Sequence, residues 1–131
     1  MQQHLANYGM HLGIAFQLVD DALDYSADPD ILGKNIGDDL AEGKPTLPLI
    51  HCMQNGSPEQ AEVIRNAIIS GALEQIEAVR SAIESTDSIT YTARRAEEQA
   101  RLAMKSVEPM PAGPYKQALL DLALYSVQRT F

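Results

Sequence analysis

Apolar residues recur every three or four positions along most of the chain, the spacing typical of amphipathic helices. No alternation of apolar and polar residues, the pattern expected of a half-buried strand, continues for more than a few positions. The pattern therefore predicts an all-α fold, a helical bundle of five or six helices.

Capping residues, prolines and glycines predict where these helices begin and end. Asp28-Pro29 ends the first helix, Asn55-Gly56 ends a short second one, and Ser57-Pro58-Glu59-Gln60 begins the third with a capping serine. The helices are expected at residues 2 to 24 or 25, 47–53, 58 to 69 or 70, 72–84, 89–107 and 115 to about 129. The long fifth helix carries small apolar residues at helical spacing, suited to close packing: Ala93, Ala96, Ala100, Ala103 and Val107.

The length of 131 residues is that of one domain with a core of its own. No internal repeat or composition boundary divides the sequence, so we expect residues 1–131 to form a single helical region.

Composition and charge exclude several classes of function. The formal net charge of -8 disfavours binding to nucleic acid or anionic lipid, although a divalent cation could still bridge the protein to a phosphorylated ligand. Cys52 is the only cysteine, which rules out an internal disulfide and favours the cytoplasm. Neither a transmembrane segment nor a signal peptide is expected.

An acidic stripe is predicted near the end of the first helix. Because each helical residue turns by about 100°, one face holds Gly13, Gln17, Asp20, Asp21 and Asp24. Like charges at this spacing, close to the negative end of the helix dipole, cost roughly 1–2 kcal/mol in sum. An Asp-Asp-x-x-Asp string alone is more often a solvated helix end, but a divalent cation would offset this cost.

The surroundings of these aspartates strengthen the interpretation as a metal site. Phe16 and Gln17 directly precede them, and a glycine-containing loop with Lys34 and Lys44 follows. Mg²⁺ binds carboxylates while it also accepts phosphate oxygens, so the aspartates offer part of a site that a diphosphate completes.

Two stretches resemble a known family. Gly13-Ile-Ala-Phe16-Gln17-Leu-Val-Asp20-Asp21-Ala-Leu-Asp24-Tyr25 resembles the second aspartate-rich motif of trans-prenyl diphosphate synthases, and residues 32–49 resemble the loop and helix start that follow it. A weaker likeness continues through residues 57–61, 94–98 and 127–129. Within this family, the likeness is strongest to bacterial octaprenyl diphosphate synthases.

The resemblance implies the carboxyl-terminal part of an isoprenoid synthase fold and a prenyltransferase reaction. An allylic diphosphate ionises with Mg²⁺ as cofactor, isopentenyl diphosphate attacks the carbocation, and a proton leaves. It implies metal binding by Asp20, Asp21 and Asp24, with Asp20 the foremost direct ligand and the other two either ligating through water or orienting the direct ligands. It further implies stabilisation of positive charge by Phe16 and Gln17, and diphosphate binding by Lys34, Lys44 and Arg129. The alternatives are core packing for Phe16 and simple solvation for the three basic residues.

The sequence also lacks parts that the family possesses. The first aspartate-rich motif and the isopentenyl diphosphate pocket are missing, so we expect a fragment that is inactive alone and whose intact parent is a homodimer. The product length cannot be read from this part. The alternative is a noncatalytic helical module that dimerises with or regulates a complete synthase. His4, His11 and His51 have no metal-ligand spacing and are expected at the surface or in satisfied core positions.

Overall fold

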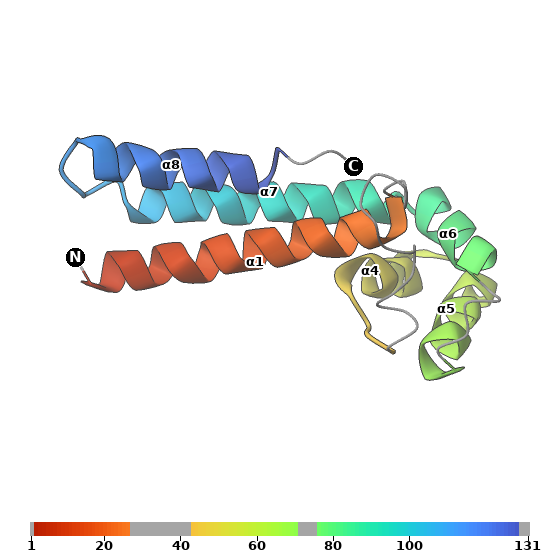
Figure 1. The fold of residues 1–131 in the computed structure, drawn as a ribbon. Helices are drawn as coiled ribbons and strands as arrows, with labels where there is room; N and C mark the ends of the chain where they lie inside the picture. The colour runs from red at the N-terminus through yellow and green to blue at the C-terminus, as the bar shows by residue number, and fades with distance from the viewer. Residues whose placement is uncertain (1, 27–42, 71–75, 129–131) are drawn as a thin grey trace. The chain divides into compact units, whose positions relative to one another are not determined.

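The computed structural model describes residues 2–26, 43–70 and 76–128, and within these ranges the regular structure is entirely α-helical (Figure 1). The helices are α1 (Gln2–Ser26), α4 (Leu47–Asn55), α5 (Pro58–Ser70), α6 (Ile76–Ser85), α7 (Ser88–Ser106) and α8 (Pro114–Ser126). The predicted all-α class is therefore confirmed. None of these described helices combines the length and the apolar character needed to cross a lipid bilayer.

Most helix ends lie within one or two residues of the predicted positions. Ser57 Oγ accepts a hydrogen bond from the Gln60 amide at 3.1 Å, and Gln60 Oε1 accepts one from the Ser57 amide at 2.9 Å. These two bonds form the predicted capping box at the start of α5. Thr46 precedes α4 in an extended conformation, and Gly56 ends it.

The predicted extension of the last helix to about residue 129 was wrong. α8 ends at Ser126, where the Val127 amide bonds to the Leu124 carbonyl at 3.3 Å and the Gln128 amide to the Tyr125 carbonyl at 3.1 Å. These i→i+3 bonds tighten the last turn and satisfy carbonyls that a longer helix would have paired.

The chain divides into two compact units, and α1 and α7 contribute residues to both. The described part of the first unit comprises residues 2–19 and 93–128. The described part of the second comprises residues 20–26, 43–70 and 76–92.

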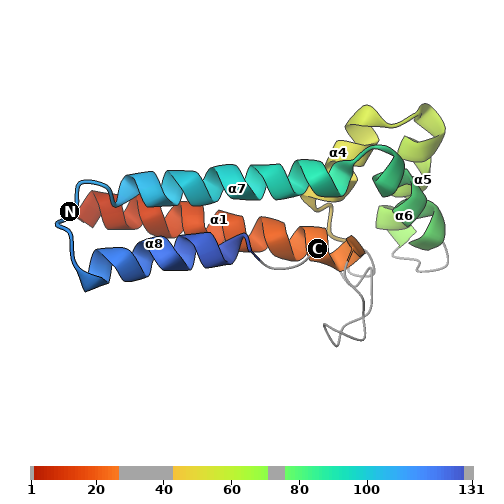
Figure 2. The ribbon, with the colours of Figure 1, turned by 90° about the horizontal axis from the view of Figure 1, so that it is seen from above.

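In the first unit, α1, α7 and α8 lie side by side, with α7 antiparallel to the other two (Figures 1 and 2). Their core contains Tyr8, Ala103, Val107 and Ala123. The predicted small-residue stripe of α7 is buried at four of its positions, and Ala93 is half-buried. The Tyr8 hydroxyl donates a 2.7 Å hydrogen bond to the Leu119 carbonyl, which joins α1 to α8 and satisfies the buried phenol.

In the second unit, α4, α5 and α6 pack against one another. Their core is continuous with the end of α1 and consists of Tyr25, Leu49, Cys52, Ile64, Ala67, Val79, Ala82 and Ile83. Through Tyr25, the last turn of α1 is held in this core. The segment that carries the three aspartates is thereby anchored in the second unit.

Candidate functional site

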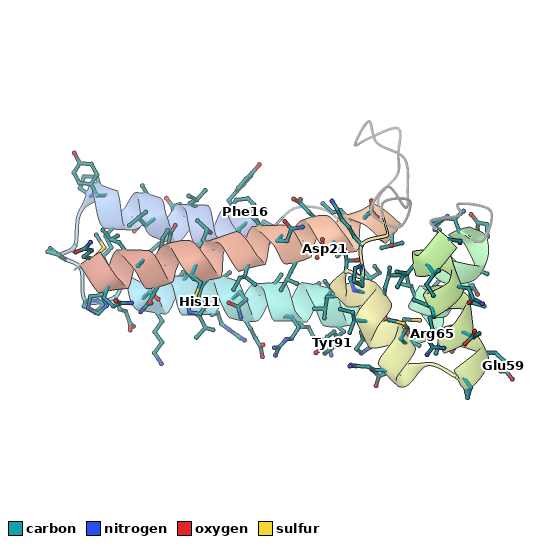
Figure 3. The ribbon with its side chains drawn as sticks, turned by 90° about the horizontal axis from the view of Figure 1, so that it is seen from below. His11, Phe16, Asp21, Glu59, Arg65 and Tyr91 are labelled. Carbon is teal, nitrogen blue, oxygen red and sulfur yellow. The ribbon has the colours of Figure 1, made fainter. Side chains whose placement is uncertain are left out.

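The three predicted metal ligands lie on the last turns of α1 and belong to the second unit; Asp21 is labelled in Figure 3. Because α1 is helical throughout this stretch, Asp20, Asp21 and Asp24 occupy successive turns of one side of the helix. Their environments differ. Asp20 is exposed, whereas Asp21 is 6% and Asp24 is 1% exposed.

Burial of two carboxylates requires compensation from their surroundings. An ionised carboxylate loses its hydration when it is buried, so such groups persist only with hydrogen-bond or ionic partners. Each of the three aspartates does have an interaction partner. Asp20 is thus the residue whose side chain is accessible to a ligand, and Asp21 and Asp24 are held within the protein.

The donor set suits a hard cation, but its members do not form a closed cage. Within the described residues, no group of three or more His, Cys, Asp or Glu side chains gathers closely enough to hold a metal ion. Mg²⁺ is commonly held by one or two carboxylates, with waters and phosphate oxygens as the remaining ligands. The accessible carboxylate of Asp20 fits that open kind of site.

Lys44 is an exposed residue of the second unit, in the short segment that leads into α4. The Thr46 amide donates to the Lys44 carbonyl at 3.0 Å, which closes a tight turn around Pro45. Gly43 has φ +74°, and an added Cβ would lie 3.4 Å from the Ile68 carbonyl oxygen of α5. Glycine at this position therefore lets the backbone turn close to α5 shortly before α4 begins at Leu47.

The other predicted site residues fall outside this group. Phe16 is half-buried and Gln17 is exposed, and both belong to the first unit. Each of these two side chains has an interaction partner within the protein. Lys34 and Arg129 lie outside the described residues.

The histidines fit the expectation of surface or satisfied positions, and two of them link helices within a unit. His11 shares a 2.7 Å hydrogen bond with Gln99 in the first unit. In the second, His51 shares a 2.7 Å hydrogen bond with Ser88 and stacks on Tyr91, with ring centroids 4.1 Å apart and planes inclined by 19°. Sequence analysis did not detect this link because the partners are separated by 37 positions.

A cavity of about 490 Å³ lies within the second unit, beside Tyr25 and along α6 and the start of α7. Its size suits a small ligand. Its rim, however, carries Glu77, Glu84 and Asp87 against one cation, Arg80. None of the predicted site residues is among the described residues that line this cavity.

Known proteins share sequence with this chain. The sequence model of the family described as polyprenyl synthetase matches residues 1–86. Octaprenyl diphosphate synthase of Haemophilus influenzae is 50% identical over an alignment of 131 positions, which covers 99% of this chain and 40% of that protein. The chain therefore spans about 40% of the length of that relative.

Two solved structures share the fold. A polyprenyl synthase of Caulobacter crescentus, crystallised with calcium and isoprenyl diphosphate, superposes with a TM-score of 0.87 and 37% identity over 97% of this chain and 39% of its own. A geranylgeranyl pyrophosphate synthase of Corynebacterium glutamicum, crystallised with isoprenyl diphosphate and magnesium, gives a TM-score of 0.83 and 32% identity over 98% of this chain and 37% of its own. The isoprenoid synthase type of helical fold, predicted from the resemblance, is thereby confirmed.

Proposed function

The chain belongs to the polyprenyl synthetase family, and from this premise we propose that it is part of a trans-polyprenyl diphosphate synthase. The intact enzyme would condense an allylic diphosphate with isopentenyl diphosphate, and the likeness to octaprenyl diphosphate synthases favours an octaprenyl product. The observation that carries the proposal is that an accessible carboxylate, Asp20, and an exposed cation, Lys44, belong to the same unit.

We propose that Asp20 contributes a carboxylate oxygen directly to Mg²⁺. Asp21 and Asp24, being buried, would instead orient Asp20 and maintain the negative potential around it. The bound ion would neutralise charge that develops on the departing diphosphate. That one relative was crystallised with calcium and another with magnesium, each together with isoprenyl diphosphate, supports a divalent ion shared with a diphosphate.

Lys44 would bind diphosphate oxygens through its ammonium group, as a point charge on a segment that α4 and α5 hold in place. Lys34 and Arg129 are proposed for the same role on the strength of the sequence resemblance. Phe16 and Gln17 would stabilise the carbocation, the ring by its negative face and the amide by its oxygen. A homodimeric intact enzyme and a cytoplasmic location remain predictions.

The test uses a chimera in which this chain replaces the matching stretch of the Haemophilus influenzae enzyme, with incorporation of labelled isopentenyl diphosphate as the measurement. We expect Mg²⁺-dependent elongation, and a loss of about 100-fold or more in kcat for Asp20→Ala, the scale of removing one preorganised electrostatic contact. Glu97→Gln, an exposed acid on α7, is the matched control and should retain full activity. Unchanged turnover and unchanged Mg²⁺ dependence for Asp20→Ala would refute the metal assignment.

A further inference from the structure

His51 is part of a hydrogen-bonded chain that joins three helices of the second unit. Its Nδ1 lies 2.7 Å from Ser88 Oγ at the start of α7, and Ser88 Oγ lies 2.6 Å from Thr86 Oγ1 in the turn between α6 and α7. Thr86 Oγ1 in turn lies 2.9 Å from the Ala82 carbonyl and 3.2 Å from the Ile83 carbonyl, both in α6. Ser88 is fully buried, so water does not complete this chain.

Proton counting determines the direction of these bonds. A carbonyl oxygen only accepts, so Thr86 uses its one hydroxyl proton toward α6. Ser88 must then donate its own proton to Thr86 Oγ1, which leaves Ser88 Oγ as an acceptor toward His51. The proton between His51 and Ser88 therefore resides on Nδ1 of the ring. If these hydrogen bonds ran in the opposite direction, Thr86 Oγ1 would face the two α6 carbonyls with no proton to donate to them.

Stacking holds the ring in the orientation that this bond requires. Ser88 and Tyr91 are three residues apart and share a face of the first turn of α7, and His51 contacts both (Tyr91 is labelled in Figure 3). α4 is thus attached to α7 by one directed hydrogen bond and one aromatic contact. On its other side, Leu49 and Cys52 of α4 pack in the core that also contains Tyr25.

The position of α4 determines where Lys44 lies. Only two residues separate Lys44 from Leu47, the first residue of α4. This junction has little conformational freedom, because it forms a tight turn around Pro45 and because the Ile50 amide donates a 3.0 Å hydrogen bond to the Thr46 carbonyl. A shift of α4 along α7 would move Lys44 relative to the aspartate-bearing end of α1, which Tyr25 anchors in the same core.

We propose that His51, in its Nδ1-protonated form, is a positioning residue that holds α4, and through it Lys44, in register with the aspartates of α1. This inference rests on the proposed function, because it assumes that Lys44 binds substrate diphosphate. It adds a residue that contacts neither substrate nor metal.

The hydrogen-bond direction is tested on the 131-residue chain by long-range ¹H–¹⁵N NMR of its histidine rings in their neutral form. His51 should show a protonated Nδ1, and Ser88→Ala should abolish that preference. The His51→Leu spectrum identifies the signal. An unprotonated Nδ1 in the unmodified chain would overturn the assigned direction.

The positioning role is tested in the chimera by a double-mutant cycle. His51→Leu should raise KM for the allylic diphosphate about fivefold, the equivalent of one hydrogen bond, and change kcat less than twofold. In a Lys44→Ala background the same change should alter KM less than twofold. An equal factor in both backgrounds would show a general structural effect and overturn the proposal.

Isosteric variants provide the matched control. His51→Asn retains a side-chain N–H near the position of Nδ1 and should restore most of the affinity, whereas His51→Asp has the same shape without the donor and should not. If His51→Leu does not fold, Ser88→Ala, which removes the acceptor of the His51 bond together with the donor to Thr86, should give at least the same rise in KM. An unchanged KM for Lys44→Ala itself would refute the role of Lys44 in the proposed function, and the NMR result would still report on the hydrogen bond.

Discussion

Cys52 illustrates how burial changes the chemistry of a single side chain. It is fully buried in the core of the second unit, where it fills the space of a small apolar residue. Burial raises the pKa of its thiol above the ordinary 9.0, and this rise is partly opposed because the Thr86 hydroxyl can turn its proton toward the sulfur in the thiolate form. The thiolate is the reactive form, so both accessibility and protonation make this cysteine inert.

We therefore predict that a thiol reagent modifies Cys52 at least ten times more slowly in the native chain than in guanidinium, as measured by absorbance of the released chromophore.

The raised pKa of the Cys52 thiol also has a consequence for the stability of the folded chain. Because the unfolded chain loses the thiol proton more readily, the contribution of Cys52 is complete below pH 9.0 and is lost as the pH rises through the folded-state pKa. Cys52→Ala should flatten the alkaline part of the stability profile, and rapid modification of the native thiol would contradict its burial.

At the scale of the element, local hydrogen bonds rather than tertiary packing determine several helix ends. The capping box of α5 has both reciprocal bonds, and Gln60 also donates from Nε2 to Ser85 Oγ at 2.7 Å. Ser85 is the last residue of α6, so this one glutamine joins the start of α5 to the end of α6.

Ser57→Ala should lower the free energy of unfolding by about 1 kcal/mol, the usual contribution of an N-cap side chain. Urea titration followed by circular dichroism measures this change. Gln60→Ala should cost more, since it removes the cap bond and the bond to Ser85, and the double variant should fall short of the sum because the two side chains form one box. The exposed Gln54→Ala at the end of α4 is the control. A wild-type unfolding midpoint for Ser57→Ala would show that packing alone holds α5.

At the scale of the whole molecule, this chain corresponds to part of the length of its relatives. The chain spans about 40% of its octaprenyl diphosphate synthase relative, and its sequence contains one of the two aspartate-rich motifs that the family resemblance implies. A single motif offers only part of the ligand set for the ions and diphosphate.

We accordingly predict that the isolated 131-residue chain shows no detectable incorporation of labelled isopentenyl diphosphate, while the chimera elongates the allylic substrate under the same conditions. Condensation by the chain alone would contradict this prediction. An inactive chimera, together with a change in the activity of the complete Haemophilus influenzae enzyme when the chain is added to it, would favour the alternative of a regulatory helical module.

Sequence by itself determined the all-α class, the order of the described helices and most of their ends. These features depend on residues within one or two turns of each other, as Ser57 with Gln60 or Gly56 with the end of α4. It also determined the family, because the motif from Gly13 to Tyr25 is contiguous. The aspartates as metal ligands and Lys44 as a diphosphate contact remain predictions.

Only the tertiary structure decided which members of the acidic stripe are accessible. Helical periodicity places Asp20, Asp21 and Asp24 on one side of α1, but it does not indicate which segments cover that side. Asp21 and Asp24 are buried and Asp20 is exposed because of how the surrounding segments pack. Likewise, His51 contacts Ser88, 37 positions further along the chain, and Tyr91, 40 positions further along. No local pattern encodes such a pairing, because it exists only after the chain has folded and the helices have packed.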